Sequence, residues 1–271
     1  MAAIPRSQRI FFGVISAAAL LVAALGIFAP ERLAAILSWL ALPPLHARFV
    51  GVLYLYGAVF TFGCMIARHP SQARYGLAVI AVWTGLLLLV SVLSLQAFDF
   101  NLLPPWLWFA SYIVYPLLAI ALLVKSRGRP AGETPGTPLP GWARLFMQAD
   151  GAIVTVLALA LIAAPGLIGR LWPWPITPLT AQTYGGPLLA YGLGSWWYAR
   201  GTWSSVRAVV TAAFVFNLGV VLVSIVYLPL FSLSEIPDLL WFLGFGASAA
   251  FLTLMLGGLR RGGEPAAEIA G

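Results

Sequence analysis

Eight apolar runs, each about twenty residues long, divide the chain and constrain its fold more than any other feature. As an α-helix, a run of this length crosses roughly 30 Å of hydrocarbon. Lipid offers the backbone no hydrogen-bond partners, so a helix is the form expected, whereas a β-barrel would show short alternating segments. The sequence therefore predicts an all-α, polytopic membrane protein with eight transmembrane helices, at 10–29, 47–67, 75–96, 104–124, 145–164, 184–200, 206–229 and 236–259.

The composition agrees with a lipid environment. Of the 271 residues, 61% are hydrophobic and only 8% are charged, whereas soluble domains carry about a quarter charged residues. The net charge of +7 would favour nucleic-acid binding in a soluble protein. Here the basic residues lie in short loops between apolar runs, so we expect the lipid bilayer as the partner and no nucleic acid.

The basic residues are distributed unevenly between the two sides of the predicted bundle. With the N-terminus inside, twelve of them are cytoplasmic and three are outside, which is the positive-inside pattern. We expect a multi-pass protein of the bacterial inner (plasma) membrane with both termini cytoplasmic, and we interpret the tryptophans near the span ends as interfacial anchors. The three outer basic residues are Arg32, Arg48 and Arg170.

The chain matches itself at an offset of about 135 residues, which becomes about 133 further along. At the first offset Pro30 falls on Pro165 and Tyr56-Gly57 on Tyr191-Gly192; at the second, Trp108-Phe109 falls on Trp241-Phe242. Each unit has an even number of spans, so both enter the membrane from the same side. The sequence thus predicts two parallel four-helix repeats, in contrast to the inverted repeats common in transporters.

The repeat sets the predicted domain boundaries. The first four-helix unit covers 1–125 and the second 142–261, with a Gly- and Pro-rich cytoplasmic linker at 126–141 and a disordered tail at 262–271. Such a linker composition gives little reason to pack. In the first outer loop, Pro30 to Leu42 has the spacing of a short interfacial helix, and the proline-rich second copy should be less regular.

Asp150 is the most unusual residue, because it falls about one and a half turns inside the fifth predicted span. An ionised carboxylate in hydrocarbon costs several kcal/mol, so such residues usually face the bundle and are often functional. Either Asp150 is hydrated near the cytoplasmic surface, or it points inward with Gln148, a loop arginine or a bound ligand as partner. Our hypothesis is that it points inward, into a polar pocket absent from the first unit.

Three other polar residues are candidate ligand contacts. Arg48 opens the second span at the outer side, where it is either a snorkelling anchor or a site for a lipid phosphate or carboxylate. Its counterpart is Gln182, so the two units differ there. Asn217 lies mid-span, where it forms an interhelical hydrogen bond or contacts a ligand or pore.

The sequence contains no recognisable catalytic or cofactor motif. It lacks a nucleophile elbow, a P-loop and a zinc motif, and its one cysteine, Cys64, lies in an apolar run. His46 and His69 fall on opposite sides of the bundle, which argues against a haem held by two histidines. We therefore predict no catalytic residues, no metal and no cofactor.

The segment from Arg48 to Gly57 and its echo from Gln182 to Gly192, each preceded by an Ala-Pro that ends the first span of its unit, resemble the small four-helix bacterial membrane proteins of the DoxX-like kind. The resemblance covers both halves and implies a fused pair of four-helix units. It carries no functional residue to this chain.

Three functions fit these features. The first is a non-enzymatic accessory or structural subunit of a membrane complex, favoured by sparse polar residues and many glycines. The alternative is a binder or carrier of a lipophilic small molecule in the cleft between the repeats, with Arg48, Asp150, Asn217 and Gln182 as contacts. The third, an intramembrane enzyme acting on a lipid, has the least support.

Overall fold

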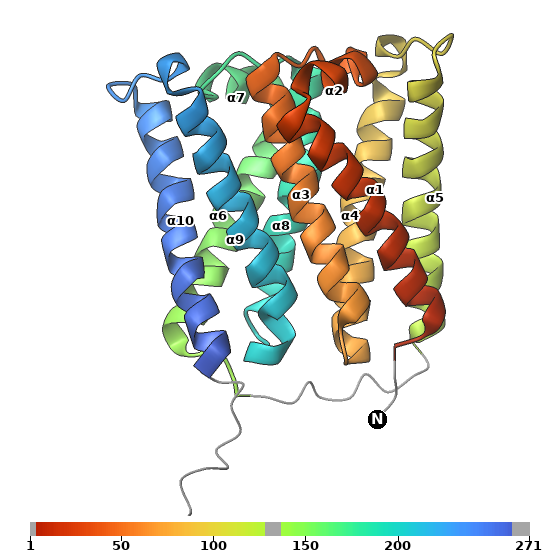
Figure 1. The fold of residues 1–271 in the computed structure, drawn as a ribbon, viewed down its shortest axis with the longest axis vertical. Helices are drawn as coiled ribbons and strands as arrows, with labels where there is room; N and C mark the ends of the chain where they lie inside the picture. Colours follow the sequence, from red (N-terminus) through yellow and green to blue (C-terminus); the bar gives the residue numbers. More distant parts are fainter. Residues whose placement is uncertain (1–3, 128–136, 262–271) are drawn as a thin grey trace, which may run out of the picture.

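The computed structural model describes residues 4–127 and 137–261, and within them the fold is all-α. Figure 1 shows long helices standing side by side. The long helices are α1 (Arg6–Phe28), α3 (Pro44–Ile66), α4 (Pro70–Leu93), α5 (Leu103–Ser126), α6 (Gly141–Ala163), α8 (Pro178–Tyr198), α9 (Trp203–Val226) and α10 (Ile236–Arg261). The short elements are the helices α2 (Pro30–Ile36) and α7 (Pro165–Leu171) and the 3-10 turns η1 (Ser38–Leu40), η2 (Leu95–Ala97) and η3 (Leu228–Leu230).

Seven of the described helices are long and apolar enough to cross a membrane, namely α1, α3, α4, α5, α6, α9 and α10. This confirms the prediction of a helical, multi-pass membrane protein. Most of the long helices begin several residues before the apolar runs, and in three of them a proline opens the helix. Pro44, Pro70 and Pro178 are the first residues of α3, α4 and α8, a position where the missing N–H and the fixed φ of proline suit a helix.

The helix α8 is as long as the others, and 21 residues rise about 32 Å. It is not among the seven apolar helices because its sequence is rich in glycine and hydroxyl-bearing residues. Those residues are buried against other helices, and they include Gly185, Gly186, Gly192 and Gly194. A helix that faces protein on most sides needs small residues for close packing more than it needs apolar ones for lipid.

Four helices form the middle of the bundle and four flank them. In the middle, α3 packs against α9 and α4 packs against α8. On the flanks, α1 packs on α3, α5 on α4, α6 on α8 and α10 on α9. The short helices α2 and α7 lie at the end opposite the N-terminus (Figure 1).

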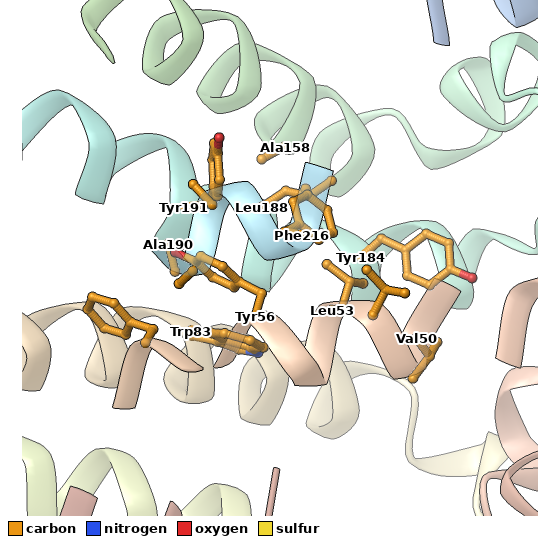
Figure 2. Packing of buried hydrophobic residues seen from close by; sticks show 14 of the residues in the cluster. Val50, Leu53, Tyr56, Trp83, Ala158, Tyr184, Leu188, Ala190, Tyr191 and Phe216 are labelled. Atoms are coloured by element: carbon orange, nitrogen blue, oxygen red, sulfur yellow. The ribbon is translucent and has the colours of Figure 1, made fainter. Parts of the chain in front are cut away.

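Aromatic side chains fill the centre between α3 and α8. The rings of Tyr56 and Tyr191 lie 5.5 Å apart between centroids, and Phe216 lies 5.8 Å from Tyr56. On the other side of Tyr56, Trp83 stacks at 5.8 Å. Figure 2 shows these four rings together, contributed by α3, α4, α8 and α9. The core of the bundle is therefore a contact between helices that are far apart in the sequence.

Most tryptophans at the end of α2 and α7 are buried, which corrects their interpretation as interfacial anchors. Trp39 packs edge-on against Trp108 at 5.4 Å, and Trp174 packs edge-on against Trp241 at 4.8 Å. All four are at most 9% exposed. Trp106, at 58% exposed, keeps the position expected of an anchor. The sequence places tryptophan at the right depth, but which face of the helix it occupies depends on the packing.

The end of the predicted linker packs against the protein, contrary to expectation. The N–H of Trp203 donates to the carbonyl of Thr137 at 3.0 Å, and Pro138 forms a bridge with Thr202. Leu139 is buried at 3% exposed. Burying the apolar side chain of Leu139 beside the turn between α8 and α9 is favourable. The overall composition of the linker does not reveal this local contact. Residues 128–136 and the predicted tail at 262–271 lie outside the described residues.

Candidate functional site

Asp150 lies deeper than its place in the apolar run suggests. Because α6 begins at Gly141, Asp150 is about 14 Å along the helix axis from its start. The side chain is half-buried, and both carboxylate oxygens accept hydrogen bonds. The hydroxyl of Tyr191 on α8 donates at 2.8 Å, and the hydroxyl of Ser248 on α10 donates at 3.0 Å.

Asn217 on α9 extends this network from the other side of Tyr191. Its amide nitrogen donates to the Tyr191 oxygen at 3.2 Å and to the carbonyl of Ala213 at 2.8 Å. The tyrosine oxygen thus accepts from Asn217, which leaves its single hydrogen free to donate to Asp150. We call Asp150, Tyr191, Asn217 and Ser248 the Asp150 cluster.

The partners of Asp150 are neutral hydroxyls, where the sequence had suggested Gln148, a loop arginine or a ligand. Arg144 is exposed and six residues earlier on the same helix. Sequence reasoning singled out Asp150 and Asn217 but did not identify Tyr191 and Ser248 as their partners.

Arg48 on α3 and Gln182 on α8 lie away from the Asp150 cluster. Each contacts the C-terminal end of a neighbouring helix, α1 for Arg48 and α6 for Gln182. The Nε of Arg48 donates to the carbonyl of Ile27 at 3.2 Å, and its guanidinium also donates to the hydroxyl of Tyr227 and lies 5.2 Å from that ring. Gln182 makes the analogous contact, with its Nε2 donating to the carbonyl of Ile162 at 3.2 Å. Of the four predicted contacts, the structure therefore brings only Asp150 and Asn217 together.

A cavity of about 370 Å³ lies between α1, α3, α4 and α5. Its walls are almost entirely apolar or aromatic, and the polar side chains in its lining are those of tyrosine, threonine, serine and tryptophan. The hydroxyls of Tyr54 and Tyr112, both in the wall, are hydrogen-bonded to each other at 2.5 Å. The lining includes Ile15, Ala18, Val22, Leu37, Gly57, Phe60, Trp83, Thr84, Leu107 and Tyr115.

A groove of about 500 Å³ lies between α4 and α8. It runs along the half of these helices nearer the N-terminal end of the bundle, and it ends at the turn after α8. The lining includes Tyr75, Val79, Val82, Leu193, Trp197 and Arg200. Cavity and groove both fall in the volume range of small-molecule sites.

Among the described residues, no group of three or more His, Cys, Asp or Glu side chains could hold a metal ion. His46 is buried in the first turn of α3, and its ring lies 5.8 Å from that of Trp174. Cys64 is buried and unpaired.

The fold defines the class of the protein as a polytopic helical membrane protein. Comparison of the chain with protein-family models, with curated proteins and with solved structures finds no match. The functional argument therefore depends on the geometry of the chain itself.

Proposed function

We propose that the chain crosses the membrane eight times, as two parallel four-helix repeats of the kind that the DoxX-like resemblance implies. The pattern of helix contacts supports this. A twofold axis along the membrane normal would exchange α3 with α8 and α4 with α9, and so would turn the α3–α9 contact into the α8–α4 contact. The flanking pairs α1–α3 and α6–α8 exchange in the same way.

Individual side chains follow the same relation. Phe49 and Tyr184, which are 135 residues apart, face each other at 4.9 Å, as do Tyr56 and Tyr191 at 5.5 Å. Contacts between equivalent residues are what an isologous interface produces on its axis. The indole of Trp108 donates to Ser91 at 2.8 Å, and 133 residues later the indole of Trp241 donates to Ser224 at 2.9 Å.

The charges support an orientation with both termini in the cytoplasm of a bacterium. The described acidic residues other than Asp150 all lie at the end of α2 and α7 and are Glu31, Asp99, Glu235 and Asp238. Basic residues gather at the opposite end, as expected for the cytoplasmic side. They include Arg6, Arg9, Arg68, Arg74, Lys125, Arg127, Arg144, Arg200 and Arg207.

For the function, we propose that the protein binds a lipophilic small molecule, and the cavity between α1, α3, α4 and α5 carries this proposal. This pocket of about 370 Å³ is open on one side and has apolar walls, so its size and lining suit a lipophilic small molecule. The sequence-based version placed the ligand between the repeats, whereas this cavity lies inside the first.

In the second repeat, the positions equivalent to part of the cavity lining are occupied by residues that are linked by hydrogen bonds. By the repeat offsets, Asp150 corresponds to Ile15, Asn217 to Thr84 and Ser248 to Tyr115, and all three first-repeat residues line the cavity. In the second repeat these positions hydrogen-bond through the Asp150 cluster. We infer that the two repeats have diverged, so that the first contains a ligand site and the second contains the Asp150 cluster, which links its helices.

An accessory or structural subunit remains the second candidate function. It is favoured by the open face of α10, where a Cβ built on Gly244 or Gly246 would meet no atom of the described chain within 4 Å. A helix of another membrane protein can approach closely at such small residues.

Native mass spectrometry of the protein, released in mild detergent from its source membrane, tests both candidates. Ligand binding predicts one non-phospholipid molecule, and Ala18→Phe, which projects a ring into the cavity wall, should reduce its recovery about tenfold or more. The matched control Ala110→Phe lies on the exposed side of α5 and should change nothing. A fixed protein partner without a small molecule would support the accessory role and contradict ligand binding.

A further inference from the structure

The groove between α4 and α8 breaks the similarity of the two central contacts. In the α3–α9 contact, a Cβ built on Gly63 would lie 2.6 Å from the Cβ of Ala208, so those helices touch closely. At the corresponding place in the α4–α8 contact, the rings of Tyr75 and Tyr198 pack edge-on at 5.4 Å. Both aromatic side chains line the groove of about 500 Å³, so it lies where the α3–α9 contact has the small residues Gly63 and Ala208.

The groove has an apolar body and a charged end. Val79, Val82 and Leu193 line its length, whereas Arg200 lines it at the turn after α8. The exposed indole of Trp197 lies beside the same end. An apolar channel that ends in a cation and a tryptophan matches a lipid molecule, because the acyl chain and the head group need these two environments.

The charge at this end is uncompensated within the described chain. Among residues 4–127 and 137–258, no acidic side chain pairs with the Arg200 guanidinium and no group forms a hydrogen bond with it. Apart from Asp150 within α6, the described carboxylates are all at the other end of the bundle. Basic pockets between transmembrane helices are typical sites for anionic lipid head groups, and arginine binds phosphate through two parallel hydrogen bonds.

We propose that the groove binds an anionic phospholipid, with the phosphate on Arg200 and one acyl chain between α4 and α8. Tyr198 lies in the groove wall, and its buried hydroxyl has no hydrogen-bond partner within the described residues. The site is separate from the cavity of the first repeat, so the two proposals stand or fall independently.

The test compares lipid binding by the full-length protein and two arginine variants. Purified protein is exchanged into detergent containing equal amounts of phosphatidylglycerol and phosphatidylcholine with identical acyl chains, and retained lipid is counted by native mass spectrometry. The native protein should retain phosphatidylglycerol in preference by about tenfold, and Arg200→Gln should abolish the preference. The matched control Arg207→Gln removes an exposed charge at the same end, outside the groove lining, and should keep the preference.

A second variant separates the groove from general surface charge. Gly194 lines the groove, and a Cβ there would lie 3.5 Å from Val79, an ordinary van der Waals distance, so Gly194→Leu adds bulk to the groove wall. Gly194→Leu should reduce the retention of both lipids. Its thermal unfolding midpoint should be similar to those of the two arginine variants, which shows that it is folded. Equal losses in Arg200→Gln and Arg207→Gln, or no preference in the native protein, would overturn the proposal, as would unchanged retention in Gly194→Leu.

Discussion

Asp150 illustrates how a carboxylate is accommodated inside a bundle without a cation. Tyr191 and Ser248 each donate one hydrogen bond to it, and hydroxyl donors avoid the cost of removing a second charge from water. Asn217 sets the direction of the network by donating to the tyrosine oxygen. The cluster thus joins α6, α8, α9 and α10 through the Tyr191 hydroxyl and the Asp150 carboxylate.

Removing the Tyr191 hydroxyl should lower the free energy of unfolding more than removing the hydrogen-bond donor of any other residue in the Asp150 cluster. Tyr191→Phe leaves both Asp150 and Asn217 short of a partner. We expect its free energy of unfolding to fall by about 1–2 kcal/mol, since an unsatisfied buried group costs ~1–3 kcal/mol and membrane hydrogen bonds average nearer 0.6 kcal/mol. Ser248→Ala should cost less, about 0.5 kcal/mol. Unfolding in mixed micelles by added SDS measures both.

The control for this prediction is Tyr56→Phe. Tyr56 is the proposed repeat equivalent of Tyr191 and is equally buried, but the structure gives its hydroxyl no hydrogen bond among the described residues. Its loss should change the unfolding free energy by less than about 0.5 kcal/mol. Equal effects of the two tyrosine variants would mean that the Asp150 cluster does not stabilise the fold.

The sequence identifies the unusual polar residues in the spans, but it does not show which of them contact one another. Asp150 and Asn217 stand out because carboxylates and amides are rare in apolar runs. Tyr191 does not stand out, since tyrosine is common in spans, and its role depends on how α6 and α9 approach α8. For the same reason the sequence cannot show that Arg48 and Gln182 lie apart from Asp150.

Among the elements, the tightest contacts are the crossings of α1 with α3 and of α6 with α8. A Cβ on Gly51 would lie 2.9 Å from the backbone of Gly26, and a Cβ on Gly192 would lie 2.8 Å from the carbonyl of Gly151. Backbone atoms cannot move aside as a side-chain end can, so these glycines are required by the crossing itself.

Alanine at these crossings should therefore push the helices apart. We expect Gly51→Ala and Gly192→Ala each to lower the free energy of unfolding by about 1–3 kcal/mol, as overpacking does. The matched control Gly244→Ala, on the open face of α10, should be neutral or stabilising by up to about 1 kcal/mol, because alanine favours a helix. A destabilised control, or unaffected crossing variants, would contradict the close packing. The same SDS titration gives all three values.

Helix number and order could be predicted well from the sequence, because apolar length and proline positions are local properties. The eight long helices occur where the apolar runs lie. The burial of the tryptophans and the packing of Leu139 could not be predicted, since each depends on a neighbour distant in the chain. Likewise, the low hydropathy of α8 can be recognised as a sign of a central position only after its contacts with α4, α6 and α9 are known.

In the whole molecule, positions that the proposed twofold arrangement would relate differ in structure. One repeat holds a cavity where the other holds the Asp150 cluster, and one central contact is closed where the other opens into a groove. The arrangement requires α8 to cross the membrane, although it is not one of the seven most apolar helices.

The topology of α8 is therefore the decisive prediction at this scale. Arg170 in α7 precedes α8 and Arg200 follows it, and both side chains are exposed. In intact cells, a membrane-impermeant thiol reagent should label Arg170→Cys from outside, whereas Arg200→Cys should react only after permeabilisation. Cys64, the single native cysteine, is buried, so the unsubstituted protein is the background control. Labelling of both sites from the same side would mean that α8 does not cross, and with it the parallel repeat and the cytoplasmic position of both termini would be lost. Labelling of Arg200→Cys alone from outside would keep eight spans but invert the orientation inferred from the basic residues.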